Sequence, residues 1–192
     1  MPEHQPRPTT SPHAFPDEPK GFLTKNPAKA AHWFQKAAAG GDAEAQLRMA
    51  RLCLQGNGLP KDADAGLRWA KTAAEQGLPD AMVLVGDLLR LADVAAADGW
   101  YRRALPAYRL RIQAGDAEAS LACGLMYAAG KGVPRDPIEG LAWMYLARGL
   151  GLNPFRGLIV QLTEAPLSKP QREQALQRTQ TLRQALFPRP KS

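Results

Sequence analysis

The residue types that most often carry chemistry are few and scattered in this chain. The histidines are His4, His13 and His32, and the cysteines are Cys53 and Cys123. A Ser–His or Cys–His nucleophile would have to use His32, and the sequence offers no His/Cys cluster with the three or four ligands of a metal site. The cysteines fall at apolar helix positions, where we interpret them as reduced, unpaired core residues. The sequence therefore predicts no catalytic residue, no metal site and no cofactor.

Two further patterns could suggest nucleotide binding, and neither is convincing. The segment GLMYAAGKG (Gly124–Gly132) is one residue too long for a phosphate loop, has no Ser or Thr after its lysine, and ends a helix instead of joining a strand to one. The large aromatic residues recur at equivalent positions of a repeat. We therefore interpret them as core residues and not as a stacking platform for bases: Trp33, Trp69, Trp100, Tyr127 and Trp143.

Composition limits the broad class of protein. The chain has 192 residues, of which 45% are hydrophobic and 22% are charged, enough to bury a core. It contains no apolar run of about 18 residues and no basic segment followed by an apolar one near its start, so we expect a cytoplasmic protein. The net charge of +7 belongs mostly to residues 154–192, which carry +5, while residues 27–153 carry +2. That distribution makes nucleic-acid binding an unfavoured interpretation.

The chain repeats itself with a period of about 36 residues. GDAEAQLRMARLCLQGNGLPKD (Gly41–Asp62) and GDAEASLACGLMYAAGKGVPRD (Gly115–Asp136) align without a gap, and a weaker copy begins at Gly77. The segments WFQKAAAGG and WAKTAAEQG align with the same spacing. A period of this length is typical of an array in which each unit is one pair of helices.

Local signals place the ends of those helices. Asp42 and Asp116 are expected as N-caps of the first helices of two units, and Asp62 and Asp136 as N-caps of the second helices. The G-x-G segments end the first helices. The middle unit departs from the pattern, because its loop is nearly absent and seven residues, Leu105–Arg111, are added before the next glycine. Pro106 is expected to kink that helix.

The residues quoted above, read as A-x-x-x-[small]-G-x-x-[YL]-x-x-G-x-G-[VL]-P-x-D and then W-x-x-x-A-A-x-x-G, resemble the Sel1-like repeat, a branch of the tetratricopeptide superfamily. The resemblance implies an all-α fold, a right-handed α–α superhelix of about three to four helix pairs. We expect a disordered proline-rich arm over residues 1–20, the solenoid over 21–151, a capping helix pair over 152–187 and a disordered tail over 188–192. In the last helix, Arg172, Arg178 and Arg183 are interpreted as a solvated face, with contact to an anionic surface as the alternative.

The resemblance also implies a function. Sel1-like proteins typically act as adaptors that hold a protein or peptide in the concave groove of the superhelix, so we expect a non-catalytic scaffold with a protein or peptide partner. One alternative is an enzyme of the cysteine-rich Sel1-like type, linked to the cell wall, although this chain lacks the cysteine pair of each such repeat. Another is an immunity or effector protein that also acts by binding.

The first helix of each unit is expected to line the groove. The positions opposite the core are polar in the first copy and become apolar in the later ones. We predict a partner helix or extended peptide across Leu84, Leu91 and Leu125, with its orientation set by Arg48, Arg51 and Asp87. The alternative is that Leu105–Arg111 or the final helix pair covers these leucines.

Overall fold

The computed structural model describes residues 27–152, 159–161 and 163–188, and within them the secondary structure is helical without strands. Three helix pairs form the repeat array. Unit one is α3 (Ala43–Gln55) with α4 (Ala63–Glu75), unit two is α5 (Pro79–Leu89) with α6 (Val94–Gln113), and unit three is α7 (Ala117–Ala129) with α8 (Pro137–Gly149). Among the residues described, α2 (Pro27–Ala39) precedes these units and α10 (Lys169–Leu186) follows them. The predicted all-α solenoid of helix pairs is confirmed.

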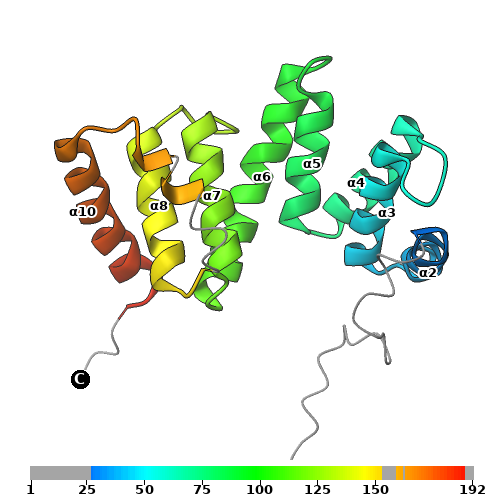
Figure 1. The fold of residues 1–192 in the computed structure, drawn as a ribbon, viewed down its shortest axis with the longest axis horizontal. Coiled ribbons are helices and arrows are strands. Elements are labelled where there is room, and N and C mark those ends of the chain that lie inside the picture. The colour runs from blue at the N-terminus through cyan, green and yellow to red at the C-terminus, as the bar shows by residue number, and fades with distance from the viewer. Residues whose placement is uncertain (1–26, 153–158, 162, 189–192) are drawn as a thin grey trace, which may run out of the picture.

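Neighbouring helices pack in chain order. The two helices of each unit pack against each other, α4 and α6 join their unit to the next one, and the helices follow one another along the long axis from α2 to α10 (Figure 1). Every buried side chain therefore has a partner on a nearby helix, as expected for a repeat array.

The predicted helix caps are confirmed. The carboxylates of Asp42, Asp62 and Asp116 each accept the backbone N–H three residues ahead, at O–N distances of 2.7 to 3.0 Å. Asp136 accepts the N–H groups of both Ile138 and Glu139. Because the first N–H groups of a helix lack internal acceptors, these four aspartates fix where their helices begin.

Alanine and glycine allow the helices to approach closely. Ala50, Ala70, Ala73 and Ala74 are fully buried within the main core, where a larger side chain would hold the helices apart. Trp143 of unit three, at the repeat position of Trp69, is 1% exposed, with Tyr127 stacked on it at a ring-centre separation of 6.2 Å. The core interpretation is wrong for Trp33, which is 53% exposed on α2, because no preceding helix covers that face within the described residues.

Units one and three share a seven-residue connection, residues 56–62 and 130–136, whose second glycine has a special role. Gly58 and Gly132 have positive φ angles of 79° and 70°. A Cβ on Gly132 would lie 2.8 Å from the backbone of Tyr101 and Arg102, and one on Gly58 would overlap the backbone of Pro27. Glycine is therefore required both by the backbone angle and by close contact with the preceding second helix.

Unit two is built differently. Its helices are joined by only four residues, 90–93, while α6 has 20 residues where α4 and α8 have 13. The segment Leu105–Arg111 is thus part of α6 and not a separate insertion. The helix continues through Pro106, whose ring is exposed on its outer side.

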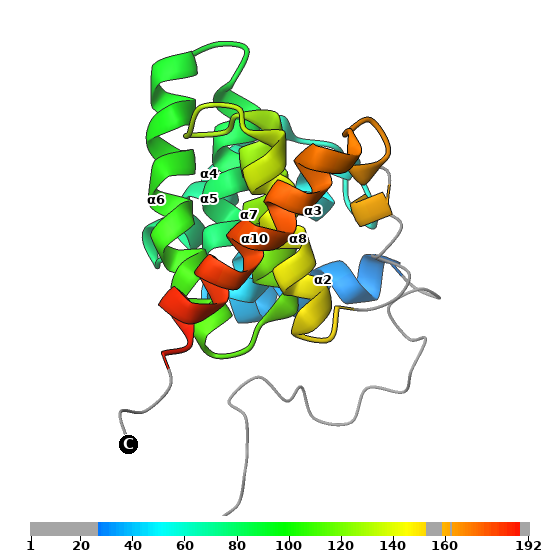
Figure 2. The ribbon, with the colours of Figure 1, turned by 90° about the vertical axis from the view of Figure 1, so that its left-hand side faces the viewer.

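The last helix packs on unit three through polar as well as apolar contacts, and Figure 2 shows α10 crossing in front of α8. Thr179 donates to the carbonyl of Ala142 at 3.0 Å, and Arg178 contacts Asp136 at 2.6 Å and Glu139 at 3.2 Å. The interpretation of Arg178 as a solvated residue is therefore wrong, since its guanidinium joins α10 to the start of α8. The expected arm over residues 1–20 lies outside the described residues, as do most of the first capping helix and of the tail.

Candidate partner-binding site

Five of the six predicted site residues lie on the first helices of three successive units. Arg48 and Arg51 are on α3, Leu84 and Asp87 on α5, and Leu125 on α7, whereas Leu91 follows the end of α5 in the short connection to α6. Arg48 and Arg51 are exposed, on the side of α3 opposite the buried Met49 and Cys53. The expected orientation of α3 is therefore correct.

Leu84 does not face solvent. It is half-buried and packs against the main core, as does Leu105 of α6. The expectation of three solvent-facing leucines is wrong at this position, because Leu84 packs against the core instead of facing solvent. Leu91 and Leu125 are accessible, with exposed fractions of 94% and 41%.

Asp87 has structural partners. Tyr101 of α6 donates its hydroxyl to Asp87 Oδ1 at 2.6 Å, and Lys131 Nζ lies 2.5 Å from the same oxygen. Burial, followed by this hydrogen bond, raises the pKa of Tyr101 above its ordinary value, so the phenol remains protonated as a donor. Asp87 thus links α5, α6 and the connection after α7, and it is not free to orient a partner as the sequence suggested.

A second link of this kind lies two turns earlier on α5. Tyr108 donates to Asp80 Oδ1 at 2.6 Å, and Arg111 bridges Asp80 and Asp116 at 2.9 and 2.7 Å. Asp80 and Asp87 are seven residues apart, as are Tyr101 and Tyr108, so the pairs repeat along two antiparallel helices. Gly86 makes room for this arrangement, since a Cβ there would overlap the ring of Tyr101.

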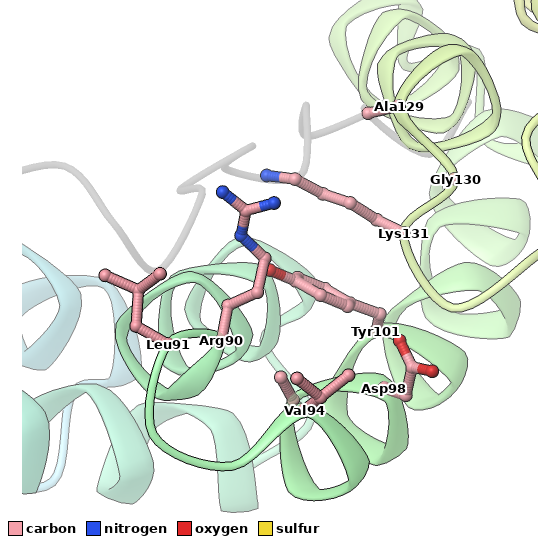
Figure 3. A pocket seen from close by; sticks show the side chains of 9 residues that line it. Arg90, Leu91, Val94, Asp98, Tyr101, Ala129, Gly130 and Lys131 are labelled. Atoms are coloured by element: carbon pink, nitrogen blue, oxygen red, sulfur yellow. The ribbon is translucent and has the colours of Figure 1, made fainter.

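A cavity of about 450 Å³ opens where these elements meet. Its lining includes Leu91 and Val94, which are 94% and 63% exposed, and the cationic side chains of Arg90 and Lys131. Figure 3 shows the charged ends of Arg90 and Lys131 converging beside Tyr101, and Lys131 Nζ lies 5.4 Å from the centre of that ring. Sequence reasoning missed Arg90, Val94 and Lys131, although the shortened connection of unit two was a signal that its ends would be arranged differently.

The cavity and the exposed leucine of α7 form one surface. Ala129 lines the cavity and lies four residues, about one helical turn, after Leu125, so both residues share a side of α7. We call the set Arg90, Leu91, Val94, Leu125, Ala129 and Lys131 the α5–α7 surface. It combines accessible apolar side chains with two cations at one edge, which suits contact with a peptide better than proton transfer or nucleophilic attack.

The two cysteine thiols are withdrawn from solvent, whereas His32 is exposed on α2. Cys53 and Cys123 are free thiols that lie in separate buried clusters, and burial raises the pKa of Cys123 to about 12. Such a thiol is neither a good nucleophile nor a good metal ligand at neutral pH. Within the part of the chain that the structure describes, no three His, Cys, Asp or Glu side chains are grouped to hold a metal ion. None of the helices described is long and apolar enough to cross a membrane.

Comparison with known proteins gives a consistent picture of the repeats. The family model of the Sel1 repeat matches residues 18–42, 43–78 and 115–152, together more than half of the chain. An uncharacterized protein of Neisseria meningitidis serogroup B is 34% identical over 91 residues, which cover 45% of this chain and 20% of that protein. The matched family segments leave out both helices of unit two, the unit whose connection and helix length are unusual.

Two solved structures are also similar. A Sel1 repeat protein from Oxalobacter formigenes has 30% sequence identity and a TM-score of 0.48, with coverage of 66% of this chain and 51% of that one. A protective antigen of uropathogenic Escherichia coli that displays an SLR fold has 24% identity and a TM-score of 0.41, with coverage of 85% and 42%. This chain thus spans a fifth of the curated relative and about half of the first of these structures.

Proposed function

The chain belongs to the Sel1 repeat family, and from that premise we propose that it is a non-catalytic adaptor that binds a protein or peptide on the α5–α7 surface. The observation that carries the proposal is the exposure of Leu91 and Leu125, at 94% and 41%, on the same side as the cavity beside Arg90 and Lys131. Accessible apolar side chains grouped beside polar ones are a recognised sign of a partner site.

The chemistry of the surface indicates how a partner would be held. An apolar side chain of the partner enters the cavity against Leu91 and Val94, and a second one packs on Leu125. Each well-buried leucine could contribute roughly 1.5–3 kcal/mol. Arg90 sits at the rim, where a carboxylate of the partner would fix its direction more than its affinity.

Arg48 and Arg51 extend the proposed site onto unit one. They are exposed on α3, the first helix of that unit, and would contact the partner only if it continues along the array. Leu84 packs against the core beneath this surface, and Asp87 contacts Tyr101 and Lys131, which line the cavity. We therefore assign them a supporting role instead of direct contact.

The test is capture of a partner from a lysate of the source organism by the immobilised chain. Leu91→Asp with Leu125→Asp should abolish capture of a stoichiometric partner and leave the melting temperature nearly unchanged. Leu176→Asp is the matched control, since Leu176 is 51% exposed on α10, away from this surface. Equal capture by the double variant and the unmodified chain would show that the α5–α7 surface is not the site.

A further inference from the structure

The second helix of unit two concentrates positive charge. It carries Arg102, Arg103, Arg109 and Arg111 against one acidic residue, Asp98, for a net charge of +3. Residues 27–153 as a whole carry only +2. The remainder of the array is therefore slightly acidic, and α6 is its local exception.

The four arginines of α6 differ in what surrounds them. Arg111 is used internally, between Asp80 and Asp116. Arg102, Arg103 and Arg109 are exposed. Arg103 lies opposite the buried Tyr101 and Tyr108, whereas the guanidinium of Arg109 lies 5.8 Å from the ring centre of Trp143, a buried residue of unit three. Arg102 has one acidic neighbour, Asp98, at 3.8 Å, an exposed pair that contributes little.

An apolar strip runs between the arginines. Leu110 is 69% exposed, Pro106 is exposed one turn before it, and Gly99 has open space where a Cβ would stand. On a helical wheel these three residues lie together, with Arg103 on one side and Arg102 on the other. The guanidinium of Arg103 lies 4.4 Å from the ring centre of Trp100, a contact that holds the side chain in place.

The second helix of unit one carries no comparable positive charge. The second helix there, α4, carries Asp64, Arg68, Lys71 and Glu75, which cancel to zero. The longer α6 supplies both Leu110 and Arg109, which belong to the seven-residue extension of unit two. The cationic strip is thus a property of the irregular unit and not of the repeat.

We propose that the outer side of α6 is a second docking surface, separate from the α5–α7 surface, for an acidic amphipathic helix of a partner protein. Its carboxylates would contact Arg102 and Arg103, and its apolar side chains would cover Pro106 and Leu110. Charge complementarity selects the acidic partner. The exposed leucine between the cations favours a helix with its own apolar stripe over a phosphate backbone, which would leave Leu110 without a contact.

The dimensions agree with one partner helix. A 20-residue helix such as α6 is about 30 Å long, so the strip from Gly99 to Gln113 offers roughly four helical turns of contact. Figure 2 shows α6 at the margin of the array, where a helix could lie alongside it. A chain with both surfaces would hold two partners at once.

The experiment uses a fluorescent 20-residue helical peptide with glutamates flanking a leucine stripe, and measures its Kd for the full chain by anisotropy. A peptide of the same composition in shuffled order and a 20-nucleotide oligothymidine are the competing probes. We expect the amphipathic peptide to bind at least tenfold more tightly than either one. Arg102→Glu with Arg103→Glu should weaken it at least tenfold, and Leu110→Ser at least threefold.

The matched control is Arg68→Glu with Lys71→Glu on α4, which should change the Kd less than twofold. A circular dichroism spectrum checks that each variant is folded. The proposal is overturned if the shuffled peptide binds equally well, if the peptide does not bind, or if the oligonucleotide binds most tightly. It is also overturned if Leu91→Asp with Leu125→Asp removes peptide binding while the α6 variants do not, because the peptide would then occupy the α5–α7 surface.

Discussion

Units one and three fasten their helices in a different way from unit two. The regular units use a seven-residue connection whose second glycine, Gly58 or Gly132, touches the backbone of the preceding second helix. Unit two has four connecting residues, and side-chain hydrogen bonds from Tyr101 and Tyr108 to Asp87 and Asp80 join its two helices. Helices can thus be held in the array by backbone contact at a glycine or by partly buried hydrogen bonds between tyrosine and aspartate side chains.

The lengths of the connections also affect which side chains are accessible to a partner. The glycine of a regular connection holds it against the preceding second helix, although Gly130 and Lys131 of the unit-three connection also line the cavity. The short connection of unit two leaves Leu91 and Val94 exposed at the edge of a cavity, and the compensating length of α6 adds the exposed Leu110. The outer side of α6 therefore belongs to the unit that departs from the repeat, and the α5–α7 surface lies between that unit and unit three.

The largest expected effect comes from breaking the backbone contact of a regular unit. Gly132→Ala should lower the free energy of unfolding by about 3–4 kcal/mol, because a Cβ would overlap the backbone of α6 in addition to the cost of a positive φ. Urea unfolding measures the change. Gly130→Ala is the control, with a similar φ of 71° but only a tight contact at 3.1 Å, and should cost about 1–2 kcal/mol. Equal losses would mean that the close contact is unimportant.

An effect of opposite sign is expected in unit two. Pro106→Ala should raise the free energy of unfolding by about 2 kcal/mol, because it restores an N–H to the middle of a continuous, exposed helical stretch. Thermal unfolding followed by circular dichroism provides the measurement, with Gln113→Ala near the end of the same helix as a control that changes little. A lower melting temperature for Pro106→Ala would show that the proline is required for the geometry of α6.

The smallest effect concerns the charged link between units two and three. Burial acts to raise the pKa of Asp116, but the Ala119 N–H and Arg111 outweigh it and hold that pKa below its ordinary value. The link therefore stabilises the fold fully above the unfolded pKa of about 3.9, and the stabilisation is lost as the pH falls through the lower, folded value. Urea unfolding between pH 7 and pH 3 should show a decline below about pH 4.

Asp116→Asn should flatten part of that decline, whereas Glu75→Gln, an exposed change on α4, should not. An unchanged pH profile in Asp116→Asn would assign the acid sensitivity to other carboxylates. The same measurement on Arg111→Met would separate the contribution of the ion pair from that of the helix cap, because the Ala119 N–H remains.

Much of the fold could be predicted because its signals are local. An aspartate that caps a helix acts on N–H groups within three residues of itself, so Asp42, Asp62, Asp116 and Asp136 could be placed without any knowledge of neighbours. The 36-residue period indicated helix pairs for a similar reason, since every copy contains its own start and stop signals. The exposed side of α3, with Arg48 and Arg51, followed from helical spacing alone.

The candidate site was less predictable, because exposure depends on which helix lies above a residue. Leu84 was expected at the surface, but it is half-buried against the core shared by the neighbouring helices. Asp87 was expected to orient a partner. Its carboxylate instead accepts hydrogen bonds from Tyr101 and Lys131, which lie 14 and 44 residues away in sequence. A local sequence pattern cannot predict contacts between residues that are this far apart in the chain.

The sequence by itself determined the repeat, the helix boundaries and the polar side of the first unit, since each depends on residues within one or two helical turns. Only the tertiary structure decided which apolar residues stay exposed, that Arg178 joins α10 to α8, and that Arg90, Leu91, Val94 and Lys131 meet around one cavity. The physical reason is that packing between helices fixes burial and side-chain pairing, and the irregular length of unit two changes that packing without changing the local signals.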